Sequence, residues 1–154
     1  MSEKAIVLRG IGKSFAGHVA VRDLSLEVPR GSVFGLLGPN GAGKTTTLRM
    51  VMDILGPDAG EVEILGRPAD HATRDRIGYM PEERGLYPRM VLEDQLVFMA
   101  SIKGIGRAEA RRRLGPWLAR LGPADWRRKK TSGLPEGLPA KAAFLAAVLH
   151  GPDG

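Results

Sequence analysis

Hydrophobic and polar residues alternate along two stretches in the first half of the chain. Leu24, Leu26 and Val28 are each separated by one polar residue, and the stretch 61–65 shows the same period of two. Alternation of this kind is typical of a strand with one face in the core and the other in solvent. Counting a short apolar run at the start, we expect strands at 5–8, 19–28 and 61–65.

A different pattern fills the middle of this half. The residues 33–37 form a continuous apolar run bounded by glycines, which predicts a strand that is buried on both faces. Directly after it, the apolar residues follow a helical spacing, with Leu48, Val51, Met52 and Leu55 on one stripe. We expect a helix at 44–54 and a further short strand at 77–80.

From position 91 onward the spacing of apolar residues is helical throughout. We expect helices at 91–103, 107–121 and 139–150. The second of these contains Gly115 and Pro116. Proline lacks the N–H that an interior helical position donates and its ring clashes with the preceding turn, so we expect this helix to be kinked or split there. Strands that alternate with helices and then give way to helices predict the α/β class.

The composition narrows the class of protein. Of the 154 residues, 43% are hydrophobic and 26% are charged, which is ordinary for a soluble globular domain. The chain has no cysteine, so disulfides and thiolate metal sites are excluded, as suits a reducing cytosol. The first residues show no signal peptide and no apolar run is long enough to cross a bilayer. We therefore expect any membrane role to operate through a partner.

The formal net charge of +6 would suit a polyanionic partner. The basic residues cluster at 111–113 and 127–130, without aromatic residues interleaved in a stacking pattern. A solvated helix face followed by a basic loop explains these clusters more simply than a nucleic-acid site does. Both interpretations stay open, and we favour the first.

The strongest functional signal is the glycine-rich stretch between the apolar run and the first helix. It matches the pattern G-x-x-x-x-G-K-[ST] with the residues Gly38, Pro39, Asn40, Gly41, Ala42, Gly43, Lys44 and Thr45. Glycines allow the chain to wrap closely around an anion, with successive N–H groups pointing inward and a helix N-terminus behind them. Lys44 then reaches the outer phosphates of a nucleotide, and the Thr45 hydroxyl ligates Mg²⁺.

Several classes of protein use such a loop. A GTPase reads guanine with an Asn-Lys-x-Asp motif, but Asn40 is the only asparagine in the chain and lies within the loop, so we exclude this class. A nucleotide or metabolite kinase is compatible with the loop but leaves the other motifs unexplained.

Further motifs stand in order around the loop. They are Phe15, Val19-Ala20-Val21, Leu24-Ser25-Leu26-Glu27-Val28 and Gly31 before it, and Thr45-Thr46-Thr47-Leu48, Gly60-Glu61-Val62 and Ile77-Gly78-Tyr79-Met80-Pro81-Glu82 after it. This order resembles that of ATP-binding cassette (ABC) transporter ATPases, over nearly the whole chain but only the N-terminal part of the family's domain. The string 81–87 resembles the bacterial exporter branch typified by sodium-extrusion ATPases.

The resemblance implies ATP and Mg²⁺ as cofactors. It implies that Phe15 stacks on the adenine ring, for which a flat aromatic face is suited. The implied nucleotide-binding residues also include Gly38, Pro39, Asn40, Gly41, Ala42, Gly43, Lys44, Thr45 and Thr46. Lys44 and Glu82 are the implied catalytic residues, and Thr45 and Glu82 the implied Mg²⁺ ligands. Glu82 stands where the family usually carries a glutamine that touches Mg²⁺ and the attacking water, and its oxygens can still accept from metal-bound water.

The same resemblance implies an architecture and a setting. The fold would be a P-loop core with an N-terminal antiparallel β region and an inserted helical subdomain, divided as 1–89, 90–133 and 134–154. The helical subdomain would dock on transmembrane permease subunits, and the ATPase domains would pair as a head-to-tail dimer. The protein would be cytoplasmic and peripheral on the inner face of the cell membrane, with no specific nucleic-acid partner.

The C-terminal part departs from the family pattern. The signature loop, ordinarily Leu-Ser-Gly-Gly-Gln, retains here only Leu134 and Gly137. Pro135 replaces the serine and offers a phosphate neither a hydroxyl nor an N–H. Pro139 is tolerable in the first turn of a helix but removes a further donor.

The family's adjacent aspartate and glutamate, which hold the Mg²⁺ shell and polarise the water, do not occur in this sequence. We expect a C-terminally incomplete fragment of an ATPase, because a parallel sheet that ends before a central strand leaves apolar faces bare. The whole protein would couple ATP hydrolysis to transport, whereas this chain alone would not hydrolyse ATP. The alternatives are a complete, non-hydrolysing nucleotide-binding or regulatory module and an ATPase associated with nucleic acid.

Overall fold

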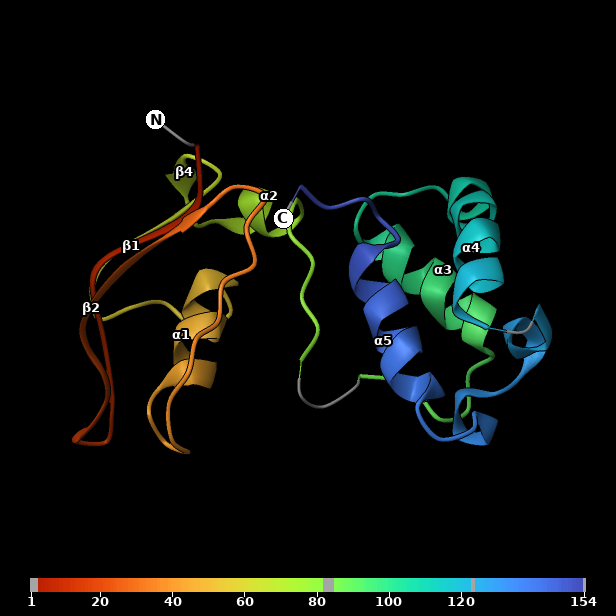
Figure 1. The fold of residues 1–154 in the computed structure, drawn as a ribbon, viewed down its shortest axis with the longest axis horizontal. Coiled ribbons are helices and arrows are strands. Elements are labelled where there is room, and N and C mark those ends of the chain that lie inside the picture. Colours follow the sequence, from red (N-terminus) through yellow and green to blue (C-terminus); the bar gives the residue numbers. More distant parts are fainter. Residues whose placement is uncertain (1–2, 82–84, 123, 154) are drawn as a thin grey trace. The chain divides into compact units, whose positions relative to one another are not determined.

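A computed structural model describes residues 3–81, 85–122 and 124–153 of the chain. They form two compact units, one containing the described residues up to position 77 and the other Gly78–Asp153 (Figure 1). Within the described residues, no helix is both long and apolar enough to span a bilayer. The division of the chain at 89 and 133 that the sequence suggests stays a prediction.

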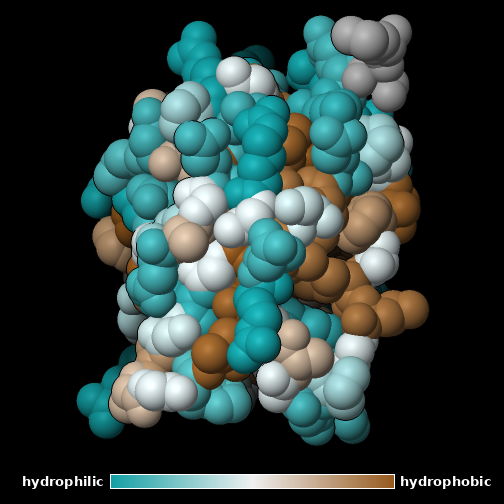
Figure 2. Space-filling view, turned by 90° about the vertical axis from the view of Figure 1, so that its left-hand side faces the viewer, coloured by the Kyte–Doolittle hydropathy of each residue, from teal (hydrophilic) through white to brown (hydrophobic). Residues whose placement is uncertain are grey.

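The first unit is built on a four-stranded antiparallel sheet in the order β2-β1-β3-β4. Its strands are β1 (Lys4–Phe15), β2 (His18–Pro29), β3 (Ala59–Ile64) and β4 (Arg67–Pro68). The strands expected at 5–8, 19–28 and 61–65 are therefore present, and the first is much longer than expected. Figure 2 shows the side of this unit, where hydrophilic side chains predominate and apolar side chains form smaller groups among them.

Helix α1 (Lys44–Val51) packs against strands β2 and β3 and is three residues shorter than the predicted helix. Its buried face is formed by Thr47, Met50 and Val51, whereas Leu48 is 47% exposed. The predicted apolar stripe is therefore wrong at Leu48, because the buried face of the helix includes its neighbour Thr47 instead. A single-turn helix, α2 (His71–Arg74), follows β4.

Two predicted strands are not formed. Residues 33–37 run without strand pairing, and Val33 and Leu37 are almost fully exposed. A buried parallel strand needs a neighbour on each side, and among the described residues no strand pairs with this segment. Residues 77–80 also make no strand pairing. Gly78 lies against the backbone of Ala147, because a methyl group at Gly78 would overlap the carbonyl oxygen of that residue.

The second unit is helical and contains α3 (Leu92–Ile102), α4 (Arg107–Leu121) and α5 (Leu138–Val148), with the 3₁₀ turns η1 (Ala124–Arg128) and η2 (Thr131–Gly133) between the last two. Its core includes the fully buried side chains of Leu96, Leu114 and Leu145. All three helices expected from the spacing are present. Helix α4 is not split at Pro116, because buried leucines on both sides of the proline hold the two halves to one core.

Candidate functional site

The glycine-rich loop 38–43 joins the exposed segment 33–37 to α1 and is itself open to solvent. Gly41 and Gly43 have φ angles of 83° and 86°, in the left-handed region that glycine adopts without a steric cost. The N–H of Ala42 donates to the carbonyl oxygen of Pro39 at 3.2 Å, which closes a turn within the loop. The backbone therefore has the tight curvature that wrapping around an anion requires.

Gly43 is constrained by β2 as well as by its own backbone. A methyl group at this position would overlap the carbonyl oxygen of Ala20 and lie 3.0 Å from Cγ2 of Val21. The loop is thereby pressed against the middle of the strand at the point where α1 begins. Any side chain at Gly43 would force the loop away from the sheet.

Lys44 lies across the loop that precedes it. Its Nζ donates to the carbonyl oxygens of Gly38 at 2.6 Å and of Pro39 at 2.8 Å. These bonds fold the lysine side chain back over the loop and place its ammonium group against the carbonyl oxygens of the first two loop residues. The ammonium group can donate to a phosphate oxygen in place of either carbonyl oxygen, because only one hydrogen bond is exchanged for another.

The three threonines after Lys44 have different environments. Thr45 is exposed, while Thr46 is half-buried. Thr47 is buried and its Oγ1 donates to the carbonyl oxygen of Gly43 at 2.9 Å. Only Thr45 and Thr46 are thus available to a ligand, and Thr47 supports the loop from below. Because the three residues are identical, only their positions on the helix could have indicated from the sequence which of them is buried.

The N-terminus of α1 is directed into the loop. Its N-cap is Gly43, which has no side chain to accept from the N–H groups of the first turn. These donors and the positive end of the helix dipole are therefore free to act on an anion. Together with Lys44, they give the start of α1 a positive electrostatic character.

Phe15 is the last residue of β1 and 45% of it is exposed. It pairs with His18 across a two-residue turn, Ala16-Gly17, in which both residues have positive φ angles. Two residues beyond His18, Ala20 contacts Gly43. Strand β2 thus connects the aromatic residue to the glycine-rich loop, and both predicted parts of the nucleotide site lie in the first unit.

An ion pair near Phe15, between Lys13 and Asp58, was not expected from the sequence. Lys13 Nζ lies 5.8 Å from the centroid of the Phe15 ring and 2.6 Å from Oδ1 of Asp58. The hydrogen bond from Lys13, followed by one from the backbone N–H of Ser14, lowers the pKa of Asp58. No sequence signal could have linked positions 13 and 58, because only the pairing of β1 with β3 brings them together.

The remaining predicted site residues are not part of this arrangement. Glu82 lies outside the described residues. Leu134 and Gly137 belong to the second unit, where Leu134 packs on the helical core and Gly137, with a φ angle of 83°, is the N-cap of α5. The N–H of Leu138 donates to the carbonyl oxygen of Pro135 at 3.1 Å, so the altered signature loop forms a tight turn.

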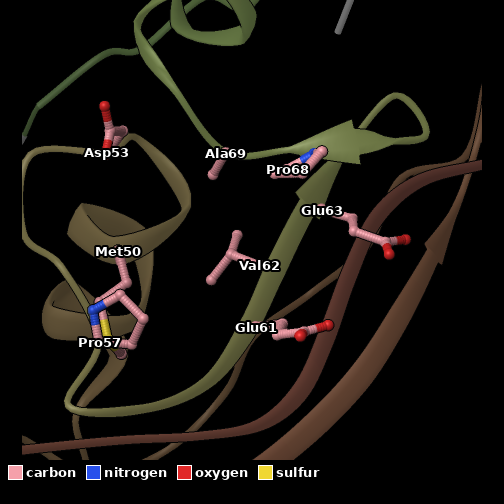
Figure 3. Close-up of a pocket in the computed structure, with 8 residues that line it drawn as sticks. All are labelled: Met50, Asp53, Pro57, Glu61, Val62, Glu63, Pro68 and Ala69. Atoms are coloured by element: carbon pink, nitrogen blue, oxygen red, sulfur yellow. The ribbon is translucent and has the colours of Figure 1, made fainter.

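A separate cavity of about 320 Å³ lies between α1 and the strands β3 and β4. Figure 3 shows Met50, Val62 and Ala69 directed into it, whereas Glu61 and Glu63 extend to the opposite side of β3. Glu63 is bound there by Arg9, which lowers its pKa. The walls of the cavity are therefore mainly apolar, without the converging polar groups that a nucleotide needs.

The sequence of this chain is similar to those of known proteins. A protein-family model described as "ABC transporter" matches residues 21–153. The chain is 46% identical to the uncharacterized ABC transporter ATP-binding protein YhaQ of Bacillus subtilis, covering 93% of this chain and 48% of that protein. It is 37% identical to the Nod factor export ATP-binding protein I of Paraburkholderia xenovorans, covering 99% of this chain and 51% of that protein.

Solved structures of ABC transporter proteins also resemble this chain. The structure of an ATP-binding subunit of an ABC transporter matches 96% of this chain and 63% of its own, with a TM-score of 0.81 and 30% identity. CbiO1 of Clostridium perfringens, part of the complex cbiONQ, matches with a TM-score of 0.81 at 23% identity, which is a likeness of fold alone. The chain spans about half the length of the curated relatives it matches.

Proposed function

Because this chain belongs to the ABC transporter family, we propose that it forms the nucleotide-binding part of a transporter's ATP-binding subunit. The α/β P-loop fold and the family expected from the sequence are both confirmed by the comparisons. The observation that carries the proposal is the geometry of Lys44, whose ammonium group lies within a glycine loop locked against β2.

The proposed ligand is ATP with Mg²⁺, and the residues of the loop fit both. Open N–H groups in 38–46 would bind the phosphates, Lys44 would neutralise their outer charge, and the exposed Thr45 hydroxyl would ligate the metal. Bound Mg²⁺ neutralises and orients the phosphate oxygens of the nucleotide. Phe15 would stack on adenine, and Glu82 would act on the metal shell and the attacking water.

For the whole protein we propose ATP hydrolysis coupled to transport. Relatives are named as ATP-binding proteins, two of them of export systems, and one structural neighbour belongs to a multi-subunit complex. The proposed partners are therefore transmembrane permease subunits and a second ATPase domain in a head-to-tail dimer. The site would then operate on the inner face of the cell membrane in which the permease subunits are embedded.

The test is retention of labelled ATP by the Lys44→Ala variant in the presence of Mg²⁺. Removing the ammonium group should weaken binding by about tenfold or more, because a charge-assisted contact to phosphate is lost. Lys4→Ala is the matched control, since Lys4 pairs with Glu27 at the exposed edge of the same sheet. Equal retention by the parent chain and Lys44→Ala, with both folded by circular dichroism, would contradict the proposal.

A further inference from the structure

The segment that follows α1 is bonded to the end of β1 through Asp58. The N–H of Asp58 donates to the carbonyl oxygen of Gly12 at 2.8 Å. Its carboxylate accepts from the backbone N–H of Ser14 at 2.8 Å and from Lys13 Nζ at 2.6 Å. One acidic residue therefore holds both the main chain and a side chain of β1, immediately before the strand's last residue.

Lys13 is held on several sides. Besides the bond to Asp58, its Nζ donates to the carbonyl oxygen of Gly56 at 2.8 Å. Its side chain is only 14% exposed, although lysine side chains usually extend into solvent. The ammonium group lies 5.8 Å from the centroid of the Phe15 ring, at a distance where a cation is attracted to an aromatic face.

The backbone near Phe15 gives the ring little support of its own. The register of β1 against β2 shifts between Ile11 and Lys13 and again between Lys13 and Ser14, so the ladder is irregular there. The turn beyond Phe15 contains Ala16, a non-glycine residue with a φ angle of 45°. A ring at the end of an irregular strand needs a side-chain contact to keep one orientation; Lys13 supplies it, and Asp58 holds Lys13 in place.

We propose that the Lys13–Asp58 pair positions Phe15 for recognition of the adenine base. The inference rests on the proposed function, because it takes Phe15 as the surface on which adenine stacks. Neither residue of the pair is bonded to the loop that would bind the phosphates. The pair should therefore affect ligands that carry a base and leave bare polyphosphates unaffected.

The test compares binding of Mg²⁺-ATP with binding of Mg²⁺-tripolyphosphate by calorimetry on the full chain. Asp58→Asn removes the charge at nearly constant shape, and Lys13→Met removes the ammonium group but keeps an apolar stem. Each should weaken ATP binding by about three- to tenfold and change tripolyphosphate binding by less than about twofold. Phe15→Ala should show the same selective loss, whereas Lys44→Ala should weaken both ligands.

Glu27→Gln serves as the matched control, because it breaks another exposed ion pair of the same sheet, to Lys4. A second measurement needs no ligand: amide hydrogen exchange at Ser14 should accelerate in Asp58→Asn, which weakens the acceptor of that N–H, and stay unchanged in Glu27→Gln.

Each failure has its own signature. Equal weakening of ATP and tripolyphosphate in Asp58→Asn would show a general structural role and overturn the inference. Unchanged ATP binding in Asp58→Asn and Lys13→Met, with loss in Phe15→Ala, would overturn it while leaving Phe15 in its role. Unchanged ATP binding in Phe15→Ala would remove the role of Phe15 and the inference together, whereas unchanged ATP binding in Lys44→Ala would contradict the proposed function itself.

Discussion

Two continuous apolar runs have opposite environments in this protein. Residues 33–37 are largely exposed, with Val33 and Leu37 almost fully so, whereas the run 144–149 lies within or next to α5 and buries Leu145 and Leu149 against the helical core. A helix satisfies its backbone hydrogen bonds internally and needs only a neighbour for its apolar face. A strand needs partners for its backbone as well, and these come from elsewhere in the chain. Similar composition therefore leads to burial in one unit and to exposure in the other.

The core of the helical unit and the glycine-rich loop of the first unit differ in the same way. The helical unit has a closed core in which α3, α4 and α5 contribute leucines from three directions. The first unit instead combines a sheet with an open loop whose glycines adopt left-handed dihedrals and whose first helical turn lacks a side-chain cap. Unsatisfied donors at a helix end lower stability but create an anion site.

The largest expected effect is in the helical core. Leu96→Ala should lower the free energy of unfolding by about 2–5 kcal/mol, because Leu96 is fully buried and its loss leaves a cavity. Leu37→Ala is the matched control and should change it by less than about 0.5 kcal/mol, because Leu37 is 92% exposed. Urea unfolding of both variants measures the difference, and similar losses would show that the exposed run 33–37 and the helical core share one environment.

A smaller loss of stability, with a large loss of binding, is expected at the loop. Gly43→Ala should cost about 1–3 kcal/mol, since alanine must adopt a left-handed dihedral and its methyl group overlaps Ala20. ATP retention should fall by about tenfold or more as the loop moves away from β2. Gly41→Ala is the control: it has a similar dihedral with nothing near the new methyl group, so its cost should be dihedral strain alone. Equal stability losses would contradict a role for the contact with β2.

A pH-dependent effect of about 1 kcal/mol or less is expected at Glu93. Hydrogen bonds from Arg127, assisted by Arg111, lower the pKa of this carboxyl, whose side chain is 18% exposed. A carboxyl with a lowered folded-state pKa stabilises the protein above its unfolded pKa, and this contribution is lost as the pH falls through the folded value. Glu93→Gln should therefore be less stable than the parent near neutral pH and equal to it at acid pH.

Urea midpoints at about pH 7 and about pH 3 test this sign. Glu136→Gln is the control, because Glu136 is an exposed acid of the same unit. A stability gap between parent and Glu93→Gln that stays constant from neutral to acid pH would show that packing, and not charge, is responsible.

The smallest effect on stability is expected at the exposed run itself. Leu37→Ser should leave the free energy of unfolding within about 0.5 kcal/mol of the parent value, yet reduce self-association, because an exposed extended apolar segment is prone to pair with another chain. Sedimentation at increasing concentration measures this. Arg112→Ser, at an exposed position of α4, is the control. Unchanged association in Leu37→Ser would show that this segment does not promote contact between chains.

Elements that depend on local pattern were predictable, and those that depend on distant partners were not. Alternation around Leu24 and Leu26 predicted β2, and helical spacing predicted α3, α4 and α5 within a few residues. The glycine-rich loop and Lys44 were identified from a fixed motif, although their binding role stays a prediction. The prediction of a strand at 33–37 is wrong, because formation of this strand depends on neighbouring strands that a local pattern does not reveal.

By itself, the sequence determined the family, the position of the glycine-rich loop and the type of most secondary elements, because each is encoded in residue types at short separation. Only the tertiary structure decided which threonine after Lys44 is buried, that Gly43 is pressed against Ala20, and that Asp58 binds Lys13. These contacts join residues from about 20 to 45 positions apart, and chain reversal through β1, β2 and β3 brings them together. The physical reason is that packing, unlike propensity, is a property of surfaces that meet only after the chain has folded.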